Sequence, residues 1–439
     1  MSRAGGIPIL RVLAAPRGRT AIAVALWLAG TGLTLALLAR QAADPAGQVA
    51  IDLDAYLAAA RRIGEGTALY AADQTGGSFA AQGVGRYLYP PLFAQLLVPV
   101  AGLPHPVVVT AWAIAQWLAV LAATWLATGL GGAPRSLERL AWCAAATAWF
   151  LPVFDTLWKG NVSGFLALAV ALLAAGGAAG GGATAAATLA KVVPVLWVPA
   201  VAAGGRRALG GMLVVAAIAL PSLLLAPGAW ADYARVLPNL AGGDAGQATN
   251  LAPWAIAGRA GLPEPVPGLL RALSIVAALG LSVLAAVTVR RRPGLAGSRQ
   301  ATVPAVAAVL LLPAAWWYHY LALLLPVAAL VWPAAGTRAR IGMTGAMTAI
   351  VLGVAWLPAA TAGALTLLGL AWSALAGHGT TPGEDRGSDA ARGDWRARRD
   401  SNSRPSGPQP DALSTELRAL EWRRGRDSNP RSRLPDSTV

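Results

Sequence analysis

Two carboxylates stand just beyond the first long apolar segment of a chain that otherwise keeps acidic residues out of its apolar segments. Asp52 and Asp54 open the run IDLDAYLAAARR at residues 51–62. Residues two apart on a helix point to different sides, so these carboxylates are not expected to act as a pair. A partly desolvated carboxylate at a membrane surface is basic enough to take a proton from a hydroxyl group. We therefore predict that one of them acts alone as a general base; a helix N-cap or a solvated loop acid is the competing interpretation.

Lysine is rare in this chain, and both lysines lie in or near apolar segments. They are Lys159 and Lys191. A cation in an apolar segment is costly and needs a partner. Lys191 is expected to bind a lipid phosphate or to pair with an acid such as Asp155. Lys159 either has a similar role or ends a helix and extends its ammonium group to the membrane surface.

Other candidate residues lie among aromatic side chains or in loops. Residues 86–93 start an apolar segment with two prolines, and tyrosines there are typical of anchoring at a membrane surface. His319 lies between aromatic residues and is either such an anchor or a functional residue. Arginines could hold a phosphate, with Arg86 favoured, although a solvated arginine is the default interpretation. They are Arg61, Arg62, Arg86 and Arg235.

Motifs for metal, nucleotide and nucleophilic chemistry do not stand out. The single cysteine, Cys143, excludes an intramolecular disulfide and a cysteine metal cluster. We find no HExxH, nucleophile elbow, phosphate-binding loop or dinucleotide fingerprint. No cofactor and no metal ion is predicted, while an ion bound by aspartate stays open as an alternative.

Long apolar helices must position these residues. The chain has 439 residues, of which 56% are hydrophobic and 13% charged, with a mean hydropathy of +0.54, too apolar for a soluble protein of this size. Apolar runs of about 20 residues recur, and the alternating pattern of barrel strands is absent. The predicted fold class is all-α, a polytopic transmembrane bundle of about 10–12 spans with interfacial helices in the first outward loop.

Twelve apolar segments are candidate spans, and the first, which lacks a convincing cleavage site, is expected to be retained. They are residues 20–40, 88–103, 107–129, 137–154, 161–178, 183–203, 211–228, 266–289, 301–316, 319–335, 340–357 and 360–376. With an even number of spans and the N-terminus in the cytoplasm, most basic loops also lie in the cytoplasm, as the positive-inside rule predicts. Those loops contain Arg206, Arg207, residues 290–292, Arg338 and Arg340, whereas Arg135 and Arg139 fit poorly.

Two long loops then face outward, residues 41–87 and 229–265, and are predicted to form a roof over an active site. After Asp52, apolar residues recur at helical spacing, which predicts a short amphipathic helix at the interface. These residues are Leu53, Tyr56, Leu57, Ala60 and Ile63. The same count places residues 155–164 on the inner side, away from this outward site.

The composition changes abruptly near residue 378. We predict a membrane domain, residues 1–379, and a disordered tail rich in Arg, Pro and Ser, residues 380–439. The tail repeats RDSNSRP as RDSNPR, which is typical of translating the complementary strand of transfer-RNA genes and indicates a gene-model artefact. A genuine basic tail that contacts anionic lipid or RNA is the alternative. The net charge of +15 is spread over helix ends and the tail, so no nucleic-acid partner is predicted.

Seven short motifs, in this order, resemble glycosyltransferase family 87, a family of integral-membrane, mannosyltransferase-like enzymes. They are Asp52-Leu53-X-X-Tyr56, Gly66-X-X-Leu69-Tyr70, Arg86-Tyr87-Leu88-Tyr89-Pro90-Pro91-Leu92-Phe93, Leu103-Pro104, Lys159-Gly160-Asn161, Lys191-Val192-Val193-Pro194 and Trp316-Trp317-Tyr318-His319-Tyr320. The resemblance covers residues 20–376. The family often has Gly-Gln-X-Asn where this chain has Gly-Asn-Val-Ser at residues 160–163, which weakens any role for an amide there.

The resemblance implies a GT-C-type enzyme that moves a hexose, mannose before arabinose, from a polyprenyl-phosphate donor to a lipid or glycan acceptor of the cell envelope. It implies inverting displacement at the outer face of a bacterial inner membrane, the plasma membrane, with Asp52 as the general base and Asp54 in reserve. His319 would contact phosphate or sugar. The residues expected to bind substrate are His319, Lys191, Tyr56, Arg86 and Tyr89. A polytopic transporter or lipid flippase is the alternative.

Overall fold

The computed structural model describes residues 15–43, 49–76, 86–240, 250–312, 318–353 and 357–377, and this part of the chain is all-helical, without strands. The predicted tail, residues 380–439, lies outside the described residues, as do Trp316 and Trp317. The first nine elements are α2 (Pro16–Ala43), α3 (Ile51–Gly64), α4 (Ala72–Thr75), α5 (Pro91–Leu97), η1 (Val98–Val100), α6 (His105–Leu130), α7 (Leu137–Trp149), α8 (Leu151–Lys159) and α9 (Ser163–Ala175).

The later elements follow in the same all-helical pattern, which confirms the predicted fold class. They are α10 (Gly177–Ala190), η2 (Val193–Trp197), α11 (Val198–Ala203), α12 (Arg206–Ala216), α13 (Ala219–Leu225), α14 (Pro227–Leu240), α15 (Pro253–Arg259), α16 (Val266–Arg291), α17 (Leu295–Leu311), η3 (Tyr318–Leu323), α18 (Leu324–Val331), α19 (Thr337–Leu352) and α20 (Leu357–Gly377).

Several helices are long and apolar enough to cross a bilayer. In the described residues five pass this test: α2, α6, α12 with α13, α16, and α20 from Pro358. A sixth span results if α7 and α8, which meet at a 65° bend, are counted as one. Other expected spans correspond to shorter apolar helices such as α9, α17 and η3 with α18. These helices indicate a multi-pass membrane protein.

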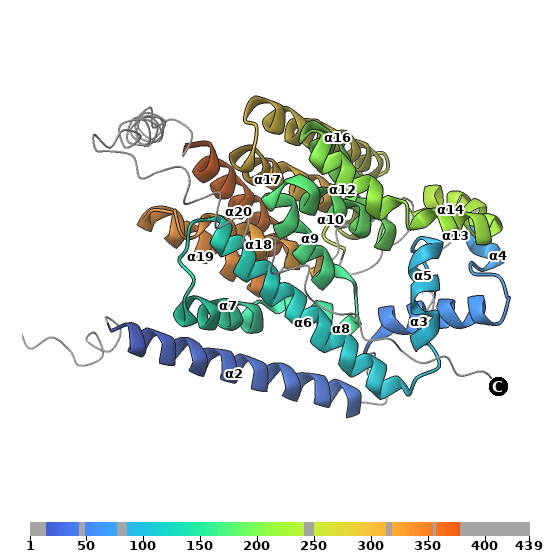
Figure 1. The fold of residues 1–439 in the computed structure, drawn as a ribbon, viewed down its shortest axis with the longest axis horizontal. Coiled ribbons are helices and arrows are strands. Elements are labelled where there is room, and N and C mark those ends of the chain that lie inside the picture. Colours follow the sequence, from blue (N-terminus) through green and yellow to red (C-terminus); the bar gives the residue numbers. More distant parts are fainter. Residues whose placement is uncertain are drawn as a thin grey trace, which may run out of the picture. The chain divides into compact units, whose positions relative to one another are not determined.

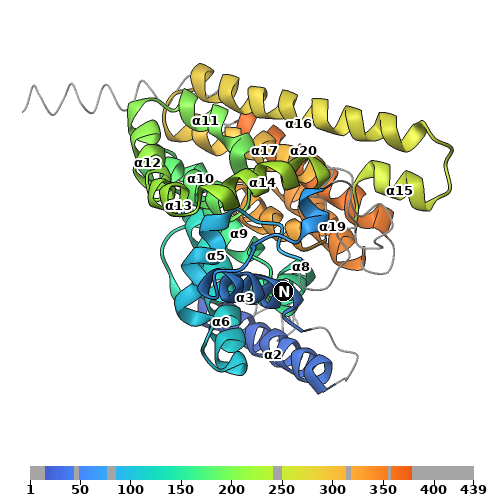
Figure 2. The ribbon, with the colours of Figure 1, turned by 90° about the vertical axis from the view of Figure 1, so that its right-hand side faces the viewer.

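The helices run between two ends of the bundle. At the end that we call the α3 end, α3, α4, α5, α13 and α14 gather on the right of Figure 1 and face the viewer in Figure 2. Helix α2 runs toward this end from Arg19, which pairs with Glu138 at the start of α7 at 2.8 Å. Helix α8 then reaches the α3 end, where the Ala50 N–H donates to the Trp158 carbonyl at 2.7 Å.

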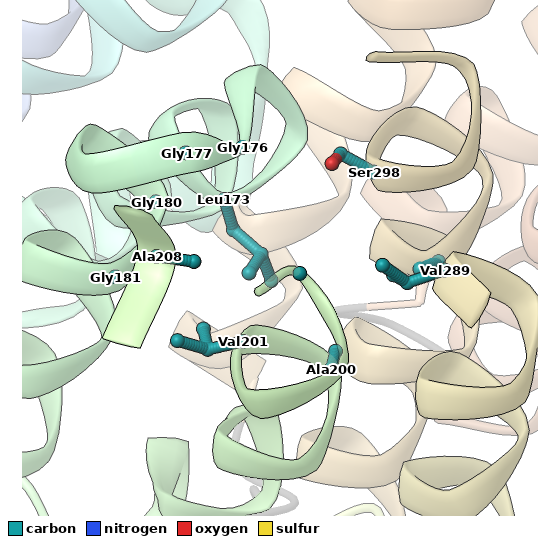
Figure 3. A pocket seen from close by; sticks show the side chains of 12 residues that line it. Leu173, Gly176, Gly177, Gly180, Gly181, Ala200, Val201, Ala208, Val289 and Ser298 are labelled. Carbon is teal, nitrogen blue, oxygen red and sulfur yellow. The ribbon is translucent and has the colours of Figure 1, made fainter. Parts of the chain in front are cut away.

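Helices α9, α10 and α11 run successively away from the α3 end, back to it and away again. Their turns at the opposite end, which we call the basic end, meet the α16–α17 turn around a small hollow (Figure 3). Glycines allow this packing, because a Cβ on Gly181 would overlap the Ala208 carbonyl oxygen. The lining of this hollow contains no ionisable side chain: Leu173, Gly176, Gly177, Gly180, Gly181, Ala200, Val201, Gly204, Ala208, Val289, Ser298 and Ala301.

Two of the predicted spans are wrong. Each error reverses the predicted side of the segments that follow it, so the second error cancels the first. Residues 88–103 do not cross, because α5 and η1 are short and α6 begins at the α3 end, where the His105 ring contacts Asp54. Residues 183–203 are not one span, because α10 ends at Lys191 and η2 starts a new direction. Between these points the predicted sidedness is inverted. Residues 155–164 therefore lie at the α3 end, and Arg139 lies near Glu138 and Arg19 at the basic end.

Candidate functional site

Helix α3 is held against α8 by its first residues. Its N-cap is Ala50, in the left-handed conformation with φ 64°, and the N–H of this residue donates to α8. Leu53 and Tyr56 are fully buried, which confirms the predicted amphipathic helix. Asp52 is the second residue of α3 rather than its cap, and it keeps partial exposure beside the buried face.

The turn from α8 to α9 delivers an amide to Asp52. Gly160 has φ +68°, and a Cβ there would lie 2.8 Å from Leu53 Cβ, so only glycine permits this close approach. Trp112 Nε1 donates to the Gly160 carbonyl at 2.8 Å and fixes the turn. The next residue, Asn161, then donates from Nδ2 to Asp52 Oδ2 at 2.6 Å.

Both ends of the Asn161 amide are engaged. Its Oδ1 accepts from the Ser163 hydroxyl at 2.7 Å and from the Ser163 N–H at 3.1 Å. These bonds identify Nδ2 as the end that faces Asp52, since only the amide nitrogen can donate to a carboxylate. Asn161 is 2% exposed, so the amide is a fixed donor rather than a mobile surface group.

Lys191 and two tyrosines complete the group around Asp52. Lys191 Nζ donates to Tyr89 Oη at 3.2 Å, and Tyr56 Oη donates to the same oxygen at 2.8 Å. Asn161 Nδ2 also lies 3.3 Å from Tyr89 Oη. The structure thus brings together four predicted site residues, Asp52, Tyr56, Tyr89 and Lys191, which we call the Asp52 cluster together with Asn161.

The surroundings of Asp52 oppose its ionisation only in part. Burial raises the pKa of the Asp52 carboxyl above its ordinary value, because the charged form loses water. The Asn161 hydrogen bond and the positive charges of Lys191 and Lys159 act in the opposite direction. The result is a carboxylate of increased basicity that is still held in one orientation, which is what proton transfer from a hydroxyl group requires.

A second charged group lies beside this cluster. Lys159 pairs with Asp155 at 3.0 Å, and His319 Nδ1 lies 3.7 Å from the same carboxylate. Thr156 Oγ1 contacts the His319 carbonyl at 3.3 Å, which ties α8 to η3. The suggested pair of Lys191 with Asp155 is therefore wrong, because Lys159, one helical turn away, takes that acid.

The remaining candidates have other contacts. Asp54 accepts from His105 at 2.6 Å, and both side chains are about half exposed. Arg86 pairs with Asp73 in the first loop. Arg235 pairs with Asp232, while Arg61 and Arg62 donate to the carbonyls of Ala101 and Leu69.

Asn161 is the main site residue that the sequence did not predict. The signal was present, since Lys159-Gly160-Asn161 was among the motifs, but the departure from the pattern Gly-Gln-X-Asn argued against an amide role. The inverted sidedness of residues 155–164 also separated it from Asp52. No group of three or more metal-ligating side chains occurs in the part of the chain that the structure describes.

Comparison with known proteins gives one family. A model of glycosyltransferase family 87 matches residues 87–313, which is about half of the chain. The matched segment contains Tyr89, Asn161 and Lys191, whereas Asp52 and His319 lie outside it. Searches of the curated proteins and of the solved structures found no significant match.

Proposed function

The chain belongs to glycosyltransferase family 87, and we propose that it transfers a hexose, mannose in the first place, from a polyprenyl phosphate to a hydroxyl group of a lipid or glycan acceptor. The family makes the protein a membrane glycosyltransferase. The donor, the sugar and the roles of individual residues are our proposal.

One observation carries the proposal, namely the 2.6 Å hydrogen bond from Asn161 to a partly exposed Asp52 whose pKa is raised by burial. Partial exposure lets an acceptor reach the carboxylate. Increased basicity lets the carboxylate take the proton of an alcohol, and the fixed amide keeps one oxygen in place. Asp54 lacks this setting, because its carboxylate is half exposed and engaged by His105.

The proposed reaction is a single displacement with inversion. Asp52 takes the proton of the acceptor hydroxyl as its oxygen attacks the anomeric carbon. The bond from that carbon to the phosphate oxygen breaks, and its electron pair leaves with the polyprenyl phosphate. Lys191, partly exposed in the same cluster, is the cation placed to compensate the negative charge of the leaving phosphate. His319 is a further candidate contact for phosphate or sugar.

The distribution of arginines supports an outward-facing site. The turns opposite the α3 end contain Arg206, Arg207 and residues 290–292. Arg19 and Arg139 lie at the same basic end. Because positively charged loops remain in the cytoplasm, this end faces inward, and the Asp52 cluster faces the outer side of an inner or plasma membrane.

A transfer assay with matched carboxylate variants tests the proposal. Membranes that contain the protein are incubated with radiolabelled polyprenyl-phosphate mannose and endogenous acceptor lipids, and products are separated by thin-layer chromatography. We expect Asp52→Asn to reduce transfer at least 100-fold, because an amide cannot take the proton, while Asp54→Asn changes transfer less than about threefold. A flippase would move the donor and leave its sugar–phosphate bond intact. Loss of transfer in Asp54→Asn alone would contradict the assignment of the base.

A further inference from the structure

Two buried tyrosine hydroxyls near the Asp52 cluster differ from the other tyrosine hydroxyls in the described part of the chain. Tyr233 is 4% exposed and Tyr320 is 0% exposed, and neither hydroxyl has a hydrogen-bond partner among the described residues. The other tyrosines behave differently. Tyr56, Tyr70, Tyr87 and Tyr318 donate to protein oxygens, and Tyr89 Oη interacts with three side chains.

Both tyrosines lie near the Asp52 cluster. The Lys191 ammonium lies over the Tyr320 ring, 4.2 Å from its centroid. Tyr89, which belongs to the Asp52 cluster, is joined to Tyr70, because the Tyr70 hydroxyl donates to the Tyr89 carbonyl at 2.6 Å. Tyr233 reaches the region from α14, where it stacks on Tyr70 with ring centroids 5.9 Å apart. The two tyrosines therefore approach from elements far apart in the sequence.

A buried hydroxyl without a partner weakens the folded protein, because it has lost water and gained nothing in return. Phenylalanine would keep both rings and avoid that cost. A group that binds from outside would supply the missing partner of each hydroxyl. An oxygen of such a ligand would complete the hydrogen bonding of Tyr233 and Tyr320.

We propose that Tyr233 and Tyr320 hydrogen-bond hydroxyl groups of the sugar that is transferred, and that they thereby determine which sugar the protein accepts. This inference rests on the proposed transfer from a polyprenyl-phosphate donor. A sugar hydroxyl, like a phenol, both donates and accepts, and it brings no charge close to the carboxylate of Asp52. A phosphate only accepts, is repelled by that carboxylate, and matches the cation of Lys191 instead.

Deoxy donors combined with tyrosine variants test the inference. The kcat/KM of wild type, Tyr233→Phe and Tyr320→Phe is measured with polyprenyl-phosphate mannose and with its 2-, 3-, 4- and 6-deoxy analogues. For each tyrosine we expect one deoxy analogue, the one that lacks the hydroxyl bound by that tyrosine, whose loss of kcat/KM does not add to the loss caused by the tyrosine variant. Removing the sugar hydroxyl from the wild-type reaction, or the phenol hydroxyl from the reaction with mannose, reduces kcat/KM by roughly tenfold. Removing both produces no further loss.

Tyr318→Phe is the matched control. It lies in the same element as Tyr320, but its hydroxyl donates to the Ile350 carbonyl at 2.9 Å, so its effect should be equal for all donors. Equal losses for every donor in Tyr233→Phe and Tyr320→Phe would overturn the sugar assignment and indicate a structural or phosphate role.

The outcome also separates this inference from the proposed function. If wild type transfers mannose and Asp52→Asn does not, but the effects of the tyrosine and deoxy changes simply add, only the sugar contacts are refuted. If wild type transfers no sugar from any of the polyprenyl-phosphate donors, the proposed function fails and the sugar contacts fail with it.

Discussion

The proposed chemistry depends on two opposing effects on the pKa of one carboxylate, burial and hydrogen bonding. Burial raises the pKa of Asp52, and the Asn161 amide lowers it. Sequence reasoning selected Asp52 and Lys191, because an acid or cation beside an apolar segment is conspicuous, and the family resemblance added Tyr56 and Tyr89. It did not select Asn161, because the motif that contains this residue departs from the pattern Gly-Gln-X-Asn and an uncharged amide is not conspicuous in the way that a charge is. It also did not find Tyr320, whose proposed role depends on which hydroxyls are left unpaired after folding.

Removing the Asn161 amide should shift the pH dependence of transfer. As the proposed base, Asp52 must be ionised, so we expect activity to decrease as the pH is lowered through its pKa. Asn161→Ala removes the contact that favours the ionised form, and we expect the acidic limb of kcat/KM to move upward by about one pH unit. The measurement is the pH profile of transfer at saturating acceptor.

Ser163→Ala provides the control for this shift. It removes the hydroxyl that bonds the opposite end of the same amide and leaves the bond to Asp52 possible. The acidic limb should then stay within about 0.3 pH units of wild type, because the loss of a neutral hydrogen bond acts only indirectly. An unshifted limb in Asn161→Ala would show that the amide does not set the basicity of Asp52.

At the scale of elements, the site is built from interruptions of helices. The α8–α9 turn carries Asn161, and the α10–η2 junction carries Lys191. An average of apolar residues over a window cannot locate such interruptions. The prediction of spans from the sequence therefore joined α10 to α11 and treated α5 as a helix that crosses the membrane. Pro194 and the helix-ending Gly160 were visible in the sequence, but their effect on direction depends on packing against α3 and α17.

Substitution of Gly160 tests the importance of the α8–α9 turn. Gly160→Ala places a Cβ 2.8 Å from Leu53 Cβ in a backbone with φ +68°. We expect destabilisation of about 2–4 kcal/mol and loss of most transfer, because the turn moves Asn161 away from Asp52. Thermal unfolding in detergent and the transfer assay measure the two effects.

Gly66→Ala separates backbone strain from the steric contact. Gly66 has nearly the same φ, +69°, and a Cβ on this residue would meet no atom within 4 Å. The expected cost is about 1 kcal/mol, with transfer preserved. Similar activity losses in both variants would mean that the contact with Leu53 is not what positions the site.

For the molecule as a whole, the sequence predicted a helical membrane bundle correctly, because composition and apolar length decide that question. It predicted the sidedness of the middle segments wrongly. Each span reverses the side of the next loop, so one wrongly counted span inverts every later loop until a second wrong span restores the order. The poor fit of Arg135 and Arg139 was the visible sign of this error. The Arg19–Glu138 pair at 2.8 Å places the start of α7 beside the start of α2, at the basic end.

Cysteine labelling can test the sidedness. In a Cys143→Ala background we expect Glu65→Cys, exposed at the α3 end, to react in intact cells with a maleimide that cannot cross membranes. Arg206→Cys, exposed at the basic end, should react at least tenfold less until the membrane is permeabilised, because the bilayer protects it. The opposite pattern would place the Asp52 cluster in the cytoplasm.

The contact between Thr156 and the His319 carbonyl at 3.3 Å has a consequence for biosynthesis. Segments made early by the ribosome must wait for η3, more than 150 residues later, before the neighbourhood of Asp52 closes. Lys159 and Asp155, which pair at 3.0 Å, are both made before η3, so each can compensate the charge of the other in α8 from the start. A nascent chain that stops before Tyr320 therefore contains Asp52, the proposed proton acceptor, without all of its surroundings, and we expect transfer activity to appear only late in translation.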